Sequence, residues 1–580
     1  MKRLISAILA LVMLAFCFAS CTAAGKGDGG TTTGGQEDKT PTDSDTDTSE
    51  PPMPEGIGIE ELPEFTIVRP TGASAGFIDA MRGFQEKIKE LYGVSLKVKD
   101  DFYREGDPMF PMGEFEIVLG ISDRPETKEF LSELRYGDYG YRLFGNRLVI
   151  AGHSEETSLK AVEKFTTDFL SAKRDDGKFF TGDPYVFADK YACDGMTLNG
   201  TPIRDYTIIY DKSSVNGKTA AEALYWAVID ASGYVLDIVT KAPEGNGKLI
   251  EIGNAPGVTE ARKAARDNFI ASGAEASNPN KYYIAATENG IWISADSLAG
   301  LCAAVRKLMA SAKTEGAVTA IGVEGERVGT FGDEGLFTVM SFNILTTAPD
   351  AARAARVVTM ILNNMPDTVG LQEASPNWMN ILKASDLMKY YDYVGVGRNG
   401  GNEGEYSAIF YKKDKFRLID SGTKWLSATP DTPNTKYDDS SYPRIMTYAV
   451  LEDKATGKQI LHINTHLEHT KSAPREKQIK VLMKEAAKLG RYPTVVTGDF
   501  NDKRNSGVYN TITGQGYLDA ALTAEKPDSG ITFPKSDKVL DYVFYTPNAV
   551  YAKSFRVCSD KIDGAYPSDH YPVFCEYCVY

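Results

Sequence analysis

The sequence predicts a multidomain α/β protein. Its 580 residues are too many for one hydrophobic core, because a domain takes roughly 150 residues. Between residues 62 and 315, short strand-like runs alternate with helical patterns. Beyond residue 336, further β-branched runs end in polar side chains. These observations predict several sheets covered by helices.

The first 21 residues resemble a bacterial lipoprotein signal. A basic start, MKR, is followed by the apolar run LISAILALVMLAF and by small residues before Cys21. The run is shorter than the roughly 18 residues that span a bilayer, which disfavours the alternative of an uncleaved membrane anchor. We therefore expect a signal peptide at 1–21, a lipidated Cys21, and an extracytoplasmic protein that is anchored to the cell membrane by lipid.

Residues 22–55 are rich in Gly, Thr, Asp, Ser, Glu and Pro and hold almost no large apolar residue. Such a segment cannot bury enough apolar surface to fold. We expect a disordered tether between the anchor and the folded domains.

Two similar stretches, 62–175 and 203–315, follow the tether. Each shows the order strand, helix, strand, strand, hairpin and helix, with a Gly-Asn or Asn-Gly pair at the hairpin tip. We predict two α+β repeat modules at 56–190 and 191–330. Neither carries a catalytic motif, so contact with glycans and simple spacing are both open as their role.

In the third predicted domain, 331–580, the segment TVVTGDFND is the most informative. A β-branched run stops at Asp499, and Asn501 follows on the same side of the chain. A carboxylate and an amide at one point suit a hydrated divalent cation or a phosphate. A buried strand followed by an Asx turn is the structural alternative.

Other strand-like runs in this domain end in the same way, and four of the five histidines of the chain lie here. A single polar residue at such a place caps a helix or starts a turn more often than it acts in chemistry. The joint occurrence favours a shared site. The residues concerned are Asn343 in LFTVMSFNI, Glu373 in DTVGLQEAS, His466 in QILHINTHLEH, Asp541 in VLDYVFYT, and Asp569 with His570 in YPSDHYPV.

In this order the blocks resemble the endonuclease/exonuclease/phosphatase superfamily, whose DNase I-like members are metal-dependent phosphoesterases. The resemblance covers residues 336 to 580, and the strings GEYSAIF, GTKWLS and YPRIMTY are similar to a bacterial secreted subgroup. It implies a C-terminal four-layer α/β sandwich, in which two mainly antiparallel sheets pack face to face with helices outside.

The resemblance also implies a metal site and an attacking water. Glu373, Asp569 and the amide oxygen of Asn343 would hold Mg²⁺ or Mn²⁺, which prefer oxygen ligands. Asp499 would orient or deprotonate the water, and Asn501 would hold it or a phosphate oxygen.

Two histidines are expected to donate to the phosphoryl oxygens or to the leaving group, each oriented by a carboxylate. The resemblance pairs Asp541 with His570 and Glu405 with His466. Arg444 in YPRIMTY would bind phosphate through its planar fork, although a surface arginine on a strand is an equally good interpretation. His462 and His469 receive no catalytic role.

Charge does not identify the substrate. The chain carries a formal charge of −15, yet residues 336–580 hold 29 basic and 28 acidic side chains. Nucleic acid, phospholipid head group and sugar phosphate are all open, and we expect phosphodiesters more than monoesters because of the paired histidines. The alternative is a catalytically inactive, glycan-binding or scaffolding surface lipoprotein.

Five cysteines lie outside the signal peptide, and an odd number argues against a full disulfide framework. Cys575 and Cys578 form a C-x-x-C. In a strand their side chains would point to opposite faces, so we expect packing rather than a zinc or redox site.

Overall fold

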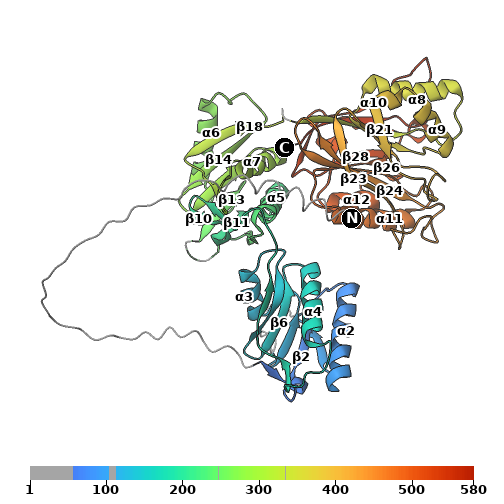
Figure 1. Ribbon diagram of the computed structural model, residues 1–580. Coiled ribbons are helices and arrows are strands. Elements are labelled where there is room, and N and C mark those ends of the chain that lie inside the picture. The colour runs from blue at the N-terminus through green and yellow to red at the C-terminus, as the bar shows by residue number, and fades with distance from the viewer. Residues whose placement is uncertain (1–55, 103–112, 244, 246, 333–334, 580) are drawn as a thin grey trace, which may run out of the picture. The chain divides into compact units, whose positions relative to one another are not determined.

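The computed structural model describes residues 56–102, 113–243, 245, 247–332 and 335–579 (Figure 1). The predicted signal peptide, Cys21 and the whole predicted tether lie outside the described residues. No helix within the described ranges is both long and apolar enough to cross a membrane.

The first module is built on a six-stranded sheet of order β3-β2-β4-β6-β5-β8. The strands β3, β2, β4 and β6 are parallel, whereas β5 and β8 are antiparallel. Helices α2 and α4 cover one face with an aromatic core, and α3 covers the other. The elements are β1 Ile57–Gly58, η1 Leu62–Glu64, β2 Thr66–Arg69, α2 Ala75–Tyr92, β3 Lys97–Asp100, β4 Glu116–Leu119, α3 Pro125–Glu133, β5 Tyr139–Phe144, β6 Arg147–Gly152, α4 Glu155–Phe169, β7 Lys178–Phe180 and β8 Tyr185–Phe187.

The second module has a six-stranded sheet of matching order, β12-β11-β13-β15-β14-β18, and a small four-stranded sheet, β10-β9-β17-β16. The elements are β9 Gly195–Leu198, β10 Thr201–Pro202, η2 Ile203–Asp205, β11 Tyr206–Tyr210, α5 Val215–Ser232, β12 Ile238–Val239, β13 Lys248–Ile252, α6 Glu260–Ser272, β14 Lys281–Thr287, β15 Gly290–Ser294, α7 Leu298–Ala310, β16 Lys313–Glu315, β17 Val318–Ile321 and β18 Glu326–Thr330.

Each module contains one helix that the sequence pattern does not predict, α3 in the first and α6 in the second. Helix α3 is only nine residues long, and α6 buries none of its side chains completely. Because neither carries a broad apolar stripe, the periodicity that indicates a helix is weak in both.

The C-terminal domain contains two six-stranded sheets, β21-β22-β20-β19-β30-β29 and β23-β24-β25-β26-β28-β27. Only the pairs β19–β20 and β25–β26 are parallel. The elements are β19 Leu336–Asn343, α8 Ala351–Asn364, β20 Thr368–Gln372, α9 Pro376–Ala384, α10 Leu387–Tyr390, β21 Tyr391–Val394, β22 Ile409–Lys412, β23 Phe416–Trp425, β24 Ile445–Asp453, β25 Gln459–His466, α11 Ser472–Lys488, β26 Thr494–Asp499, α12 Gly507–Gly514, β27 Leu518–Asp519, α13 Ala520–Thr523, η3 Pro534–Ser536, β28 Asp541–Tyr545, β29 Val550–Val557 and β30 Val573–Val579.

The predicted four-layer sandwich is confirmed. One apolar core, with Val339 and Val495 among its members, lies between the two sheets. A second joins the first sheet to α8, α9 and α10, and a third joins the other sheet to α11 and α12. Figure 1 shows these two groups of helices on opposite sides of the sheets.

Polar side chains at the sheet interface tie the two sheets together. The amide nitrogen of Gln372 donates to Asn464 Oδ1 at 2.7 Å, and Thr497 Oγ1 lies 3.0 Å from the same oxygen. Gly370 is required here, since a Cβ would lie 2.3 Å from Thr497 Oγ1. This contact holds the strand ends of the two sheets at a fixed separation.

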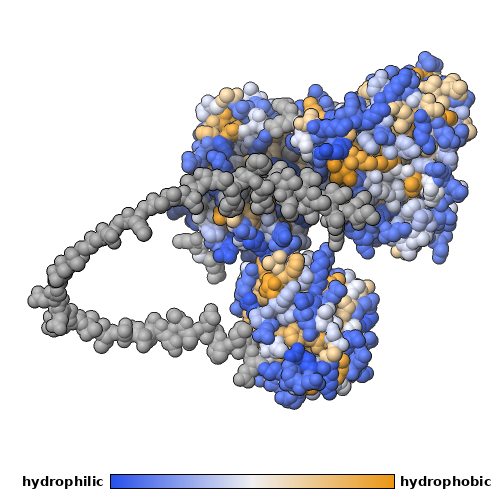
Figure 2. All heavy atoms as spheres, in the orientation of Figure 1, coloured by the Kyte–Doolittle hydropathy of each residue, from blue (hydrophilic) through white to orange (hydrophobic). Residues whose placement is uncertain are grey.

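The five cysteines of the described residues are all buried. Cys575 and Cys578 belong to different apolar clusters, as alternate sides of a strand require. The face shown in Figure 2 is largely hydrophilic, with scattered apolar areas.

Candidate active site

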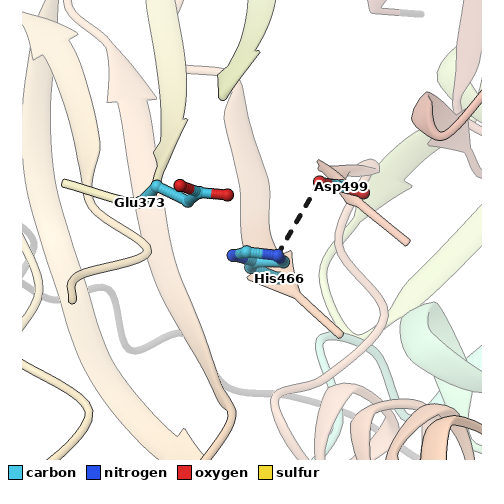
Figure 3. A group of neighbouring side chains, drawn as sticks. All are labelled: Glu373, His466 and Asp499. Carbon is cyan, nitrogen blue, oxygen red and sulfur yellow. Dashed lines mark ion pairs between the residues drawn. The ribbon is translucent and has the colours of Figure 1, made fainter. Parts of the chain in front are cut away.

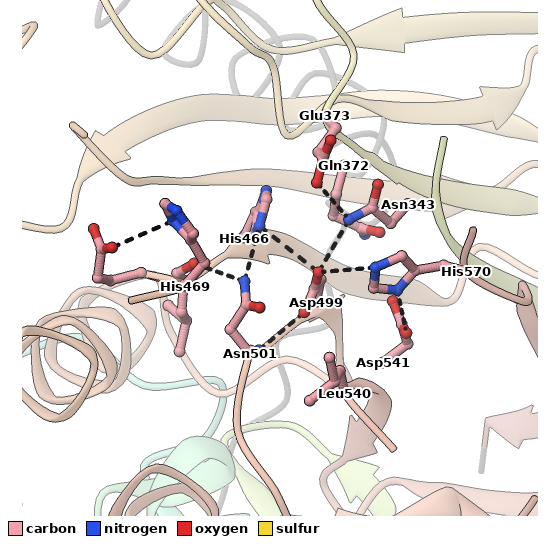
Figure 4. A network of polar contacts seen from close by, with 12 residues as sticks. Asn343, Gln372, Glu373, His466, His469, Asp499, Asn501, Leu540, Asp541 and His570 are labelled. Carbon is pink, nitrogen blue, oxygen red and sulfur yellow. Dashed lines mark hydrogen bonds and ion pairs between the residues drawn. The ribbon is translucent and has the colours of Figure 1, made fainter. Parts of the chain in front are cut away.

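Strand register brings the predicted polar residues to one edge of the sandwich. His466 and Asp499 are paired neighbours at the ends of the parallel strands β25 and β26, and Asp541 faces Asp499 from the start of β28. In the other sheet, Asn343 ends β19 beside Gln372, and Glu373 follows directly. These side chains and His570 lie together in Figure 4.

Asn343 links the two sheets at this edge. Its amide nitrogen donates to Glu373 Oε1 and to Asp499 Oδ2, both at 3.0 Å. Its amide oxygen accepts from the backbone N–H of Leu345 at 3.0 Å. In the structure the amide nitrogen faces the carboxylates and the oxygen accepts from the backbone, so metal ligation by this oxygen stays a prediction.

Glu373 is held in an unusual backbone conformation, with φ at 60°. A glutamate at positive φ is strained, and such strain is found where the surrounding structure fixes a functional side chain. The backbone N–H of Thr346 donates to its second carboxylate oxygen at 2.7 Å. The carboxylate is thus fixed from two sides and directed toward the cavity.

His570 and Asp541 form the predicted pair. His570 Nδ1 lies 2.8 Å from Asp541 Oδ2, and the hydroxyl of Thr532 donates to the same oxygen at 2.7 Å. Burial opposes the charged imidazole, but Asp541 and Asp499 outweigh it and raise the pKa of His570 to about 10. His570 is therefore a charged donor at neutral pH.

Asp499 lies at the centre of the cluster and is only 2% exposed. Burial raises the pKa of its carboxyl group above the usual range, although His570 acts in the opposite direction. The backbone N–H of Asn501 donates to Asp499 Oδ1 at 2.9 Å. A carboxylate with a raised pKa is a competent acceptor for the proton of a water molecule.

His466 differs from His570 in charge. Burial, Arg444 and Arg398 hold the pKa of His466 well below its usual range, so the ring is neutral. The amide nitrogen of Asn501 lies 3.0 Å from its Nε2, which is 3.7 Å from Asp499. Figure 3 shows His466 between Asp499 and Glu373.

The predicted pairing of Glu405 with His466 is not formed in the part of the chain that the structure describes, and it stays a prediction. Within the described ranges, the Glu405 carboxylate accepts a hydrogen bond from Arg398 at 2.7 Å and makes none with His466. A guanidinium carries a permanent charge and binds a carboxylate more strongly than a neutral ring does.

Asp569 lines the cavity but is not part of a group of close ligand atoms. Its carboxylate accepts from Lys535 Nζ at 2.9 Å. The described residues contain two groups whose ligand atoms all lie within 4.8 Å of one another. The first group is Glu373, His466 and Asp499, and the second is Asp499, Asp541 and His570. Asp499, and not Asp569, thus shares a group of close ligand atoms with Glu373.

Arg444 is buried, as a phosphate-binding arginine in a pocket would be, and is only 4% exposed. Its Nη2 lies 3.1 Å from His469 Nδ1. Burial and Arg398 lower the pKa of the guanidinium. Arg398 itself lies over the ring of Tyr442, 4.4 Å from the ring centroid.

Sequence reasoning missed several residues of the site, of which Glu468 is the most deeply buried. Its carboxylate accepts from the hydroxyls of Ser440 and Thr470 and from the backbone of Ser441, at 2.8 to 2.9 Å. These bonds hold the pKa of Glu468 far below its usual range. The place of Glu468 in the string NTHLEH was the one sequence signal that could have indicated its role.

His462, by contrast, is a buried structural residue beside Thr497.

Many of these side chains line one cavity of about 510 Å³, although Asn343, Glu468 and Asp541 are not among its lining residues. The lining residues are Thr346, Glu373, Arg398, Glu405, Tyr442, Arg444, His466, His469, Asp499, Asn501, Phe533, Lys538, Leu540, Asp569 and His570. Glu373, Asp499 and Asp569 make one part of the wall acidic, and Arg398 and Arg444 make another part cationic.

The family model of the endonuclease/exonuclease/phosphatase family matches residues 340–570. A curated relative, the CCR4-Not complex 3'-5'-exoribonuclease subunit Ccr4 of Mycosarcoma maydis, is 26% identical over 244 residues, which are 30% of this chain and 36% of that protein. The corresponding subunit of Yarrowia lipolytica is 27% identical over 232 residues, 28% of this chain and 32% of that protein. The chain thus spans about a third of the length of these relatives.

Among solved structures, an endonuclease/exonuclease/phosphatase from Bacteroides vulgatus is 31% identical, with 43% of this chain and 100% of that chain covered and a TM-score of 0.39. A mannosyl-6-phosphatase of Bacteroides thetaiotaomicron is 29% identical, with 42% and 99% covered and a TM-score of 0.38. The match to the family model makes residues 340–570 a domain of the endonuclease/exonuclease/phosphatase superfamily.

Proposed function

We propose that the C-terminal domain hydrolyses a phosphate ester by in-line attack of water, assisted by a divalent metal ion. The observation that carries this proposal is the meeting of Glu373, Asp499, neutral His466 and charged His570 in one cavity. Ester hydrolysis needs a proton acceptor for water and a donor for the leaving oxygen, and these side chains offer both.

The donor set fits a hard divalent cation. Glu373 and Asp499 bring carboxylate oxygens into one group with His466. Oxygen ligands suit Mg²⁺ or Mn²⁺ better than softer metals. Glu373 would hold the ion, which when bound would supply positive charge to the phosphoryl oxygens, and Asp499 beside it would remain free to accept a proton.

The remaining steps belong to the side chains. Asp499 would take the proton of the attacking water, and Asn501 would keep His466 in place beside it. His570, held by Asp541, would donate a proton to the leaving oxygen. Arg444 would contact a non-bridging oxygen of the phosphoryl group.

Hydrolysis of p-nitrophenyl phosphate and bis(p-nitrophenyl) phosphate by the purified protein tests this function. We expect hydrolysis with Mg²⁺ or Mn²⁺, loss of it with EDTA, and recovery when the metal is restored. Glu373→Gln should require a higher metal concentration, because it removes an anionic ligand. Activity that is indifferent to EDTA would exclude metal assistance, and no activity on any ester would favour the inactive scaffold instead.

We also propose that the protein is a secreted bacterial lipoprotein, anchored through Cys21 outside the cytoplasmic membrane. The sequence pattern of the first 21 residues supports this. Cys21→Ser should abolish metabolic labelling with palmitate and release the protein from the membrane fraction. Labelling that persists in the variant would exclude this anchor.

A further inference from the structure

One part of the cavity wall carries two guanidinium groups that the proposed chemistry uses only in part. Arg398 and Arg444 line it together with His469 and Tyr442. The guanidinium of Arg398 lies 4.4 Å from the ring centroid of Tyr442, and the imidazole of His469 stacks nearly parallel to the same ring at 6.1 Å. The tyrosine thus fixes both neighbours in position.

Arg444 is a buried guanidinium without a carboxylate partner. Within the part of the chain that the structure describes, the only hydrogen bond of the Arg444 side chain is to His469 at 3.1 Å. The buried Nε of Arg444 makes no hydrogen bond there, and the guanidinium takes part in no ion pair. The neighbouring carboxylate of Glu468 is occupied by hydroxyl and backbone donors. A buried charge is unfavourable unless a counter-ion compensates it, so this geometry is arranged for an anion that arrives with the substrate.

The cationic wall and the acidic group share one cavity of about 510 Å³. This volume is large enough for a phosphoryl group together with part of its leaving group. His466 stands near both, since it lies 3.7 Å from Asp499 and lines the small recess that Arg398 and Arg444 also line.

The number of non-bridging oxygens on the phosphorus distinguishes phosphodiesters from phosphomonoesters. A phosphodiester has two non-bridging oxygens and one negative charge, whereas a monoester has three and carries up to two charges. The acidic part of the wall, together with a bound metal ion and His570, would act on the attacking water and on the leaving oxygen. The cationic wall then offers extra donors in the fork geometry that suits a terminal phosphate.

On the basis of the proposed function, we propose that Arg398, Arg444 and His469 form a subsite for the terminal oxygens of a phosphomonoester. The domain then acts on monoesters in preference to diesters, in contrast to the expectation drawn from the sequence. Arg444 is the central donor of this subsite, and Arg398 is the second.

The experiment compares kcat/KM of the full-length protein on p-nitrophenyl phosphate and on bis(p-nitrophenyl) phosphate. The wild type should prefer the monoester. Arg398→Gln and Arg444→Gln should lower kcat/KM for the monoester by about tenfold or more and for the diester by less than about threefold. Arg417→Gln, an exposed arginine that pairs with Glu452 on β23 and β24, is the matched control and should change neither.

A preference for the diester, or equal losses on both esters, would overturn the subsite while leaving the proposed function intact. Binding of inorganic phosphate, measured by calorimetry, decides the matter even if neither ester is hydrolysed. Phosphate should bind the wild type and the control alike and bind both variants about tenfold more weakly. Equal binding by all four proteins would overturn the proposal.

Thermal unfolding separates an anion subsite from a structural role. Because Arg444 has no carboxylate partner, Arg444→Gln should leave the unfolding temperature of the C-terminal domain unchanged or raise it without phosphate. The stabilisation that phosphate gives the wild type should be lost. A marked fall of the unfolding temperature in the absence of phosphate would assign Arg444 to the fold instead.

Discussion

Glu116 in the first module and Asp499 in the C-terminal domain are both buried carboxylates, but their surroundings differ. Glu116 is fully buried, and it accepts from Arg124 at 2.8 and 3.1 Å and from Lys99 at 2.7 Å. These partners outweigh the effect of burial and lower the pKa of Glu116 to about 2. Asp499 has only amides, a backbone N–H and two imidazoles around it, and its pKa is raised.

This difference in ion partners separates a structural charge, Glu116, from a functional one, Asp499. Glu116 is compensated within the fold, so its charge stabilises the module and has no chemistry left to perform. Asp499 has only the charged ring of His570 as a counter-ion, 3.8 Å away and shared with Asp541, and Arg444 has no carboxylate partner among the described residues. Both groups therefore cost stability and stay reactive. The predictions below test this contrast.

Asp499→Asn should have the largest effect on activity. The amide cannot accept a proton from water, and we expect kcat to fall by about three orders of magnitude. Stability should not fall, because a costly buried charge is removed. Steady-state kinetics with thermal unfolding checks both. Asp392→Asn on the exposed side of β21 serves as the control, and a variant with normal kcat would exclude Asp499 as the acceptor.

Glu116→Gln should have the opposite signature. The change leaves Arg124 and Lys99 without their carboxylate, and the free energy of opening β4 should fall by about 3 kcal/mol. Hydrogen exchange of the β4 amides measures this local opening in a chain of several domains. Ester hydrolysis should not change. Unaltered exchange would show that the buried ion pairs do not stabilise the module.

His570→Gln should lower kcat by about a hundredfold, since a neutral amide replaces a charged donor. The hydrogen bond to Asp541 can be kept by glutamine, so folding should persist. A leaving group of low pKa, which needs no proton, should restore most of the rate. Equal losses for good and poor leaving groups would contradict the role of His570 as the donor.

The pH dependence of stability should show a smaller effect. The folded pKa of Glu116 is depressed to about 2 from an ordinary 4.5, so its stabilisation is complete above pH 4.5 and is lost as the pH falls toward 2. The difference in β4 opening between wild type and Glu116→Gln should therefore shrink across this window. A difference that stays constant from pH 6 to pH 2 would contradict the depressed pKa.

Much of the C-terminal fold is predictable from the sequence. In TVVTGDFND, the β-branched run and its polar stop give both the strand β26 and the position of Asp499. The contact between Asp541 and His570 is also found as expected. These features are local or rest on ordered motifs, which sequence patterns capture.

Other parts of the site depend on how distant loops pack, and patterns of single segments do not contain that information. The amide of Asn343 turns its nitrogen to the carboxylates because the backbone of Leu345 occupies its oxygen. Glu405 binds Arg398, a residue that no motif marks. Glu468 was visible only as one letter of a string, and its four donors come from two loops.

Glu373 is proposed to hold one divalent ion beside Asp499 and His466. Anomalous diffraction from crystals grown with Mn²⁺ tests it most directly. The account predicts a peak at about 2.1 to 2.2 Å from a carboxylate oxygen of Glu373 and close to Asp499, and its loss in Glu373→Gln. A strong manganese peak elsewhere, with none between these two carboxylates, would contradict it.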